Sequence, residues 1–115
     1  MKMIGMNNYQ EAIEEFDLYP TNFVGDLGVL TGLVSEAGEV ADVYNKYIRG
    51  DHKYAGPAAI EFNPALKKEL GDVLWFVATL SRRLGFSLSD VADANLTKLT
   101  SRKERGVLRG DGDER

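Results

Sequence analysis

Apolar residues recur every three or four positions along most of this chain, and only three prolines interrupt them. Such spacing is typical of amphipathic helices, whereas half-buried strands alternate apolar and polar residues. The pattern predicts four helices, at about residues 8–17, 26–49, 64–84 and from Ser87 or Ser89 to about 105. Gly50, Gly85 and Gly106 follow the last three, where a left-handed glycine commonly ends a helix. The sequence therefore predicts an all-α fold.

Each predicted helix carries an apolar stripe that must be buried against another element. Four such helices in 115 residues predict a four-helix bundle-type subunit. Four stripes in so short a chain leave one broad side uncovered, so we expect assembly as a homodimer or homotetramer. The expected core residues are Tyr9, Ala12, Ile13 and Phe16, then Leu30, Leu33, Val34, Ala37, Ala41, Tyr44 and Ile48, then Leu66, Leu70, Val73, Val77, Leu80 and Leu84, and finally Leu88, Val91, Ala92, Leu96 and Leu99.

The composition limits the chemistry that the chain can carry. It has no cysteine and a single histidine, His52, which excludes cysteine-based metal sites and the usual multi-histidine sites. The formal net charge of -4 argues against binding to duplex nucleic acid. No apolar stretch is long enough to span a membrane, and residues 1–6 are not a signal peptide. We therefore expect a cytoplasmic protein in which oxygen atoms hold any metal ion.

Two segments depart from the helical pattern. Residues 50–62 form a connection longer than most in a compact domain, and such connections are commonly functional or mobile. Residues 107–115 are rich in glycine and charge. We therefore divide the chain into a helical domain, residues 1–106, and a flexible charged C-terminal tail, residues 107–115.

Two pairs of acidic residues lie at the margin of the predicted core. Glu36 and Glu39 share one face of the second helix, and Glu69 and Asp72 share one face of the third. If these helices pack antiparallel, the four carboxylates converge and repel one another. Either the pairs stay in solvent, as acidic pairs on helices usually do, or a cation lies between them. Oxygen ligands favour Mg²⁺ or Mn²⁺, whereas the rival di-iron site requires histidines on the helices, and His52 lies in a predicted loop.

The fourth predicted helix carries a complementary polar line. Asn95, Lys98 and Arg102 follow one another at i, i+3 and i+7, and their side chains can donate hydrogen bonds to phosphate oxygens. Taken alone, such a line is more often the exposed flank of a helix with a basic C-terminus. Beside a metal site, it predicts a polyphosphate clamp. Phe76 shares a face with Asp72 and is our candidate to stack on a base, although aromatic residues within helices are more often core.

The paired acids resemble the signature of a known family. Glu36-Ala-Gly-Glu39, followed about thirty residues later by Glu69-Leu-Gly-Asp72, is similar to the ExxE…ExxD signature of the MazG-like, all-α nucleoside triphosphate pyrophosphohydrolases. The resemblance runs from about residue 27 to 109. It rests on the strings GLVSEAGEVADVYNKY, LKKELGDVLWFVATL and ANLTKLTSRKERGV, which resemble that family's second, third and last helices.

This resemblance implies an oligomeric enzyme of nucleotide-pool housekeeping that hydrolyses (d)NTP to (d)NMP and pyrophosphate. It implies Mg²⁺ bound by the four acids Glu36, Glu39, Glu69 and Asp72. We assign the catalytic roles to Glu39, as the base that activates water, and to Glu69. The substrate-binding residues are then Asn95, Lys98, Arg102 and Phe76.

Two other functions fit the same residues. One is a phosphoribosyl-ATP pyrophosphohydrolase activity, which belongs to the same broad superfamily. The other is a helical interaction module without catalysis, in which the acidic pairs meet Lys98 and Arg102 of a partner chain. That second alternative requires no metal ion, so a metal-dependent gain in thermal stability separates it from the enzymes.

Overall fold

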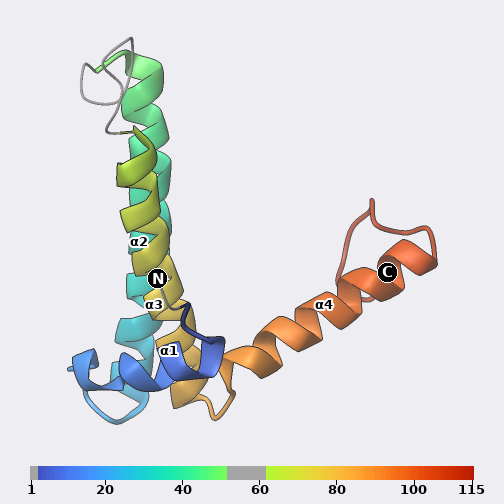
Figure 1. Ribbon diagram of the computed structural model, residues 1–115, viewed down its shortest axis with the longest axis horizontal. Coiled ribbons are helices and arrows are strands. Elements are labelled where there is room, and N and C mark those ends of the chain that lie inside the picture. Colours follow the sequence, from blue (N-terminus) through green and yellow to red (C-terminus); the bar gives the residue numbers. More distant parts are fainter. Residues whose placement is uncertain (1–2, 52–61) are drawn as a thin grey trace.

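A computed structural model describes residues 3–51 and 62–115 of the chain. Within this part there are four α-helices, a short 3-10 helix and no strand, so the all-α prediction is confirmed (Figure 1). In chain order the elements are α1 (Met6–Ala12), η1 (Glu14–Phe16), α2 (Phe23–Arg49), α3 (Phe62–Arg83) and α4 (Leu88–Glu104).

Local hydrogen bonds explain where the helices begin and end. The side chain of Asn22 accepts a hydrogen bond from the amide of Gly25 at 3.1 Å and begins α2 three residues earlier than predicted. Gly50, at φ 82°, ends it. Of the two serines that could begin α4, Ser87 accepts from the amide of Asp90 at 3.1 Å. The first helix is shorter than predicted because α1 stops at Ala12 and continues as the 3-10 turn.

Helices α2 and α3 run side by side as a long antiparallel hairpin, which we call the α2–α3 hairpin (Figure 1). Val29 and Val43 are the buried valines of α2. Between them, Gly32 lies against the ring of Phe76, and a Cβ at this position would come within 2.2 Å of that ring. The helices therefore approach closely at this point because residue 32 has no side chain.

Helix α1 packs across the base of the hairpin. Ile13, Ala78 and Leu88 form the buried cluster there. The buried side chain of Gln10 donates hydrogen bonds to the carbonyls of Ala78 and Phe86 and accepts one from the amide of Leu88, each at 3.0 Å. One glutamine thus joins α1 to the end of α3 and to the start of α4.

Ion pairs fix the segment between η1 and α2 to the end of α3. The nearly buried carboxylate of Asp17 accepts hydrogen bonds from Arg82 at 2.5 Å and from Arg83 at 2.7 and 2.8 Å. These bonds, led by those of Arg83, hold the pKa of Asp17 below its ordinary value even though burial acts in the opposite direction. Arg83 also donates to the carbonyls of Tyr19 and Pro20.

The four helices do not close into the predicted bundle within one chain. Helix α4 leaves the base of the hairpin and projects away from it (Figure 1). The radius of gyration is 17.4 Å, whereas a compact domain of this length has about 13 Å. Of the apolar residues predicted to face inward from α4, Leu88 is buried, whereas Val91, Leu96 and Leu99 are exposed. Helix α4 contacts α1 and α3 where it leaves the hairpin. Leu96 and Leu99 lie farther along the helix and stay exposed in the single chain.

The predicted core stripe of α2 is also wrong for the single chain. Leu30, Val34, Tyr44 and Ile48 are exposed. The residues of α2 that face α3 each come one position before a residue of this stripe. They include Val29 and Val43, which are buried, and Gly32, which allows the ring of Phe76 to approach. Helix α2 therefore has two apolar sides, of which α3 covers one. The prediction selected the other side, which is largely exposed, although the ring of Tyr44 on this side contacts that of Phe62 in α3.

The predicted loop at residues 50–62 lies mostly outside the described residues, and His52 lies outside them entirely. Residues 107–115, predicted to be a flexible tail, return as a series of turns along α4 (Figure 1). The boundary between domain and tail stays a prediction. Among the described residues, none of the helices has the length and apolarity that a membrane span requires.

Candidate metal centre

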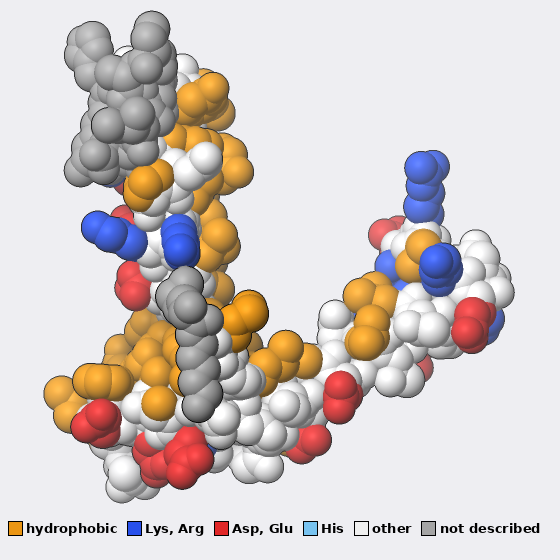
Figure 2. All heavy atoms as spheres, in the orientation of Figure 1, with side chains coloured by type: hydrophobic (Ala, Val, Ile, Leu, Met, Phe, Trp, Pro, Cys, Tyr) orange, Lys and Arg blue, Asp and Glu red, His pale blue; other side chains and the backbone are white. Residues whose placement is uncertain are grey.

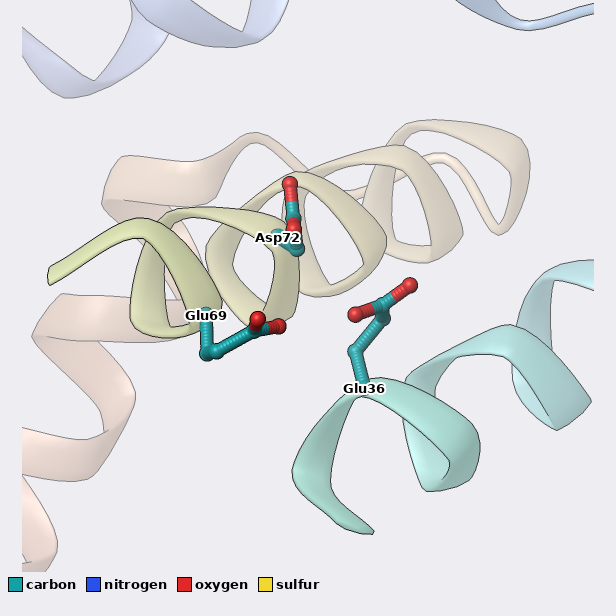
Figure 3. A group of neighbouring side chains, drawn as sticks. All are labelled: Glu36, Glu69 and Asp72. Atoms are coloured by element: carbon teal, nitrogen blue, oxygen red, sulfur yellow. The ribbon is translucent and has the colours of Figure 1, made fainter. Parts of the chain in front are cut away.

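Three carboxylates meet between the two long helices. Glu36 of α2 and Glu69 and Asp72 of α3 each offer an oxygen, and these oxygens lie within 4.8 Å of one another (Figure 3). Glu36 lies seven residues, or two helical turns, from both buried valines, Val29 and Val43, so it faces α3. Glu69 and Asp72 share a face because they are three residues apart. We call these three residues the acidic group.

The acidic group is electrostatically strained without a cation. Two full charges at 4.8 Å repel by about 3 kcal/mol at an effective dielectric constant near 20. Burial, followed by the charges of Asp72, Glu69 and Glu39, raises the pKa of Glu36 above its ordinary value. None of the three carboxylates forms an ion pair with another residue of the described segments. Three oxygen donors without a protein cation suit a hard divalent ion such as Mg²⁺ or Mn²⁺.

The raised pKa of Glu36 predicts how pH affects the metal-free protein. A carboxylate whose pKa is higher in the folded chain than in the unfolded chain stabilises the fold at pH values below its unfolded pKa, here 4.5. This contribution is lost as the pH rises through the pKa of the folded chain. Between about pH 4 and pH 7 in chelator, Glu36→Gln should therefore become steadily more stable than the wild type. Thermal unfolding of both proteins at matched pH measures the difference. A difference that stays constant with pH would contradict this electrostatic assignment.

The other residues predicted near the acids occupy different environments. Glu39, the fourth predicted ligand, is exposed and lies outside the acidic group, although its charge contributes to the raised pKa of Glu36. Phe76 lies one turn beyond Asp72, and its ring packs against Gly32 and forms a T-shaped pair with the ring of Tyr19. The ring therefore fills the contact between α2 and α3, and its stacking on a base stays a prediction.

The polar line of α4 does not meet the acidic group of its own chain. Asn95 is exposed and lines a groove of about 490 Å³ where α4 leaves the hairpin. Lys98 and Arg102 lie further along α4, and both form an ion pair with Asp113 in the returning C-terminal segment. The other residues lining the groove are Ile4, Gly5, Met6, Tyr9, Leu74, Leu88, Val91 and Ala92.

Two residues near these sites were missed by the sequence analysis. Tyr9, predicted only as core, has its pKa raised by burial and then by the charge of Asp72, so its phenol lies in the electric field of the acidic group. Asp113 was assigned to a flexible tail. Periodicity reports which face of a helix is apolar but gives no position for an acid in an irregular segment, so no sequence signal could have paired Asp113 with Lys98.

Comparisons with known proteins cover the part of the chain that holds the acidic group and the polar line of α4. Residues 26–107 match the model of a family described as the MazG nucleotide pyrophosphohydrolase domain. The chain is also similar to the Gene 37 protein of Mycobacterium phage L5, with 42% identity over 112 residues that cover 93% of this chain and 96% of that protein. No solved structure matches the chain. The family match includes the acidic group and the polar line of α4.

Proposed function

Because the chain belongs to the MazG nucleotide pyrophosphohydrolase family, we propose that it is a Mg²⁺-dependent enzyme that cleaves nucleoside triphosphates, (d)NTP, to the monophosphate and pyrophosphate. The observation that carries this proposal is the convergence of Glu36, Glu69 and Asp72, whose oxygens lie within 4.8 Å. A housekeeping role in the nucleotide pool fits a catalyst that takes free nucleotides rather than duplex nucleic acid.

Each residue of the proposed site has a separate role in this cleavage. Glu36, Glu69 and Asp72 would hold the ion, which when bound neutralises phosphate charge and lowers the pKa of water. Glu39, which is exposed and whose charge acts on Glu36, is proposed as the base that accepts the proton of the attacking water. The water oxygen attacks the α-phosphorus, and the bond from this phosphorus to the α–β bridging oxygen breaks. Lys98 and Arg102 donate hydrogen bonds to the departing pyrophosphate.

A second copy of the chain is proposed to cover the exposed apolar surface. The single chain exposes 8571 Å², whereas a folded monomer of this mass typically exposes about 6,200 Å². The excess is larger than the surface that one partner buries in a standard protein interface, about 800 Å². Figure 2 shows apolar side chains on the hairpin and on α4, along the concave side between them. The exposed apolar residues of α3 and α4 include Leu70, Leu74, Val91, Leu96 and Leu99.

This assembly would also complete the site. Helix α4 projects away from its own hairpin, and its polar line does not reach the acidic group of the same chain. We propose that α4 of one subunit packs along the hairpin of another. The line of Asn95, Lys98 and Arg102 then serves the acidic group of the second copy. An active site built from two chains would explain why α4 combines exposed leucines with phosphate-binding side chains.

The experiment that tests this function is a pyrophosphate-release assay over standard and modified nucleoside triphosphates. We expect pyrophosphate and the matching monophosphate with Mg²⁺, and no turnover with chelator. Absence of pyrophosphate from every nucleotide tested, or release of orthophosphate with the diphosphate, would contradict the proposed cleavage. Phosphoribosyl-ATP as one of the substrates separates the alternative activity within the superfamily. Rates with Mn²⁺ show which ion the site prefers.

A further inference from the structure

Arg102 is buried although it lies near the free end of α4. Its side chain is only 6% exposed, and its hydrogen-bond partners lie in the C-terminal segment. Its terminal nitrogen Nη2 donates to the carbonyl of Asp113 at 2.9 Å and to the carboxylate Oδ1 of Asp113 at 3.2 Å. Lys98 Nζ donates to the same Oδ1 at 3.3 Å. One carboxylate oxygen therefore accepts hydrogen bonds from two cations that are one helical turn apart.

The segment that delivers Asp113 has a defined path. We call residues 107–115 the C-terminal strap. Gly106, Gly110 and Gly112 have positive φ values of 72°, 131° and 82°, which allow the chain to turn back along α4. The guanidinium of Arg115 holds the two limbs of the strap together. It donates to the carbonyls of Val107, Leu108 and Gly112, and Arg105 donates to the carbonyl of Arg115.

We propose that the C-terminal strap is an autoinhibitory element that places Asp113 on Lys98 and Arg102, where the phosphate oxygens of the substrate bind. This inference rests on the proposed function, which assigns these two cations to phosphate. A carboxylate and a phosphoryl group present the same kind of oxygen acceptor to Lys and Arg donors. Asp113 and the substrate therefore compete for the same hydrogen bonds, and the nucleotide must displace the strap before it binds.

The contact is suited to a reversible block. The side chain of Asp113 is 80% exposed, and that of Lys98 is 40% exposed, so water and salt weaken their attraction. A triphosphate carries several negative charges, compared with one on Asp113, and it therefore binds the same cations more strongly. The hydrogen bonds of Arg102 and then of Lys98 also keep the pKa of Asp113 below its ordinary value, so the strap stays charged at neutral pH.

The test measures binding of inorganic tripolyphosphate by calorimetry to the full-length protein in buffer with Mg²⁺. Asp113→Asn removes the competing charge and should tighten binding by about three- to tenfold, the range expected for two ion pairs that share one exposed carboxylate. Asp111→Asn is the matched control, because it makes the same change two residues away, where the described residues provide no ion pair. It should leave binding unchanged. For a nucleotide substrate, Asp113→Asn should lower KM by a similar factor and leave kcat unchanged.

Further variants separate failure of the strap from failure of the proposed function. Lys98→Ala should weaken tripolyphosphate binding. If it does so but Asp113→Asn does not tighten binding, the strap proposal alone is overturned. Binding that Lys98→Ala leaves unchanged would overturn the phosphate assignment, and the strap with it. Asp113→Ser should repeat the effect of Asp113→Asn with a side chain too short to reach both cations. Weaker binding in both Asp113 variants would show that Asp113 positions the cations instead of blocking them.

Discussion

Glu69→Gln and Asp72→Asn should each reduce pyrophosphate release by about 100-fold or more, because a bound divalent ion supplies several kcal/mol of transition-state stabilisation. Both residues offer oxygens within 4.8 Å of Glu36. The amides keep the shape of the side chains but remove a charge that the ion requires. In chelator, these variants should unfold at the same temperature as the wild type or higher, since one of three repelling charges is gone. Assays at saturating Mg²⁺ and thermal unfolding in chelator measure the two effects.

The control for this loss is Asp42→Asn, which makes the same chemical change on α2 outside the acidic group. Asp42 forms an ion pair with Lys46 at 2.7 Å on the surface of the helix. Such pairs contribute about 1 kcal/mol or less, so this variant should keep nearly full activity. If Glu69→Gln and Asp72→Asn retained wild-type turnover, the acidic group would not be the catalytic centre. If Asp42→Asn lost activity equally, the effect would come from the total charge.

The positions of the acids could be predicted because helical periodicity determines them. Glu69 and Asp72 share a face wherever α3 lies, and two helices joined in sequence usually pack side by side. The separation between Glu39 and the acidic group could not be predicted in this way. A spacing of three residues rotates the side chain by 60° from Glu36, so the two need not reach the same point. Which acid of a pair faces the neighbouring helix depends on packing, here on the contact between Gly32 and Phe76.

The position of α4 could not be predicted from its own residues. Its apolar stripe indicates that the helix is buried, but not whether its partner belongs to the same chain. The direction in which α4 leaves the hairpin is set at its first turn, where Leu88 is buried and its amide bonds to Gln10. Gln10 is a polar residue in the first helix, and polar residues are rarely chosen as core. A hydrogen bond between residues 78 positions apart leaves no trace in a local sequence pattern.

Leu96→Asp should dissociate the proposed assembly into monomers and remove most of its activity. Leu96 is 65% exposed in the single chain and lies on the stripe of α4 that a second copy is proposed to cover. Loss of a buried leucine costs about 2 kcal/mol in the interface, which weakens dimerisation about 30-fold, and burying the new charge adds to this cost. Sedimentation velocity over a range of concentrations, with pyrophosphate release measured on the same samples, checks both outcomes.

Thr97→Asp provides the matched control, since it adds the same charge at the next position. Thr97 is exposed and lies on the side of α4 that carries Asp93 and Glu104, where an acid meets solvent. It should leave both the assembly and the activity intact. An oligomer that survived Leu96→Asp would show that the apolar face of α4 does not form the interface. A Leu96→Asp monomer with full activity would show that each chain holds a complete site, so the polar line of α4 would not need a second subunit's acids.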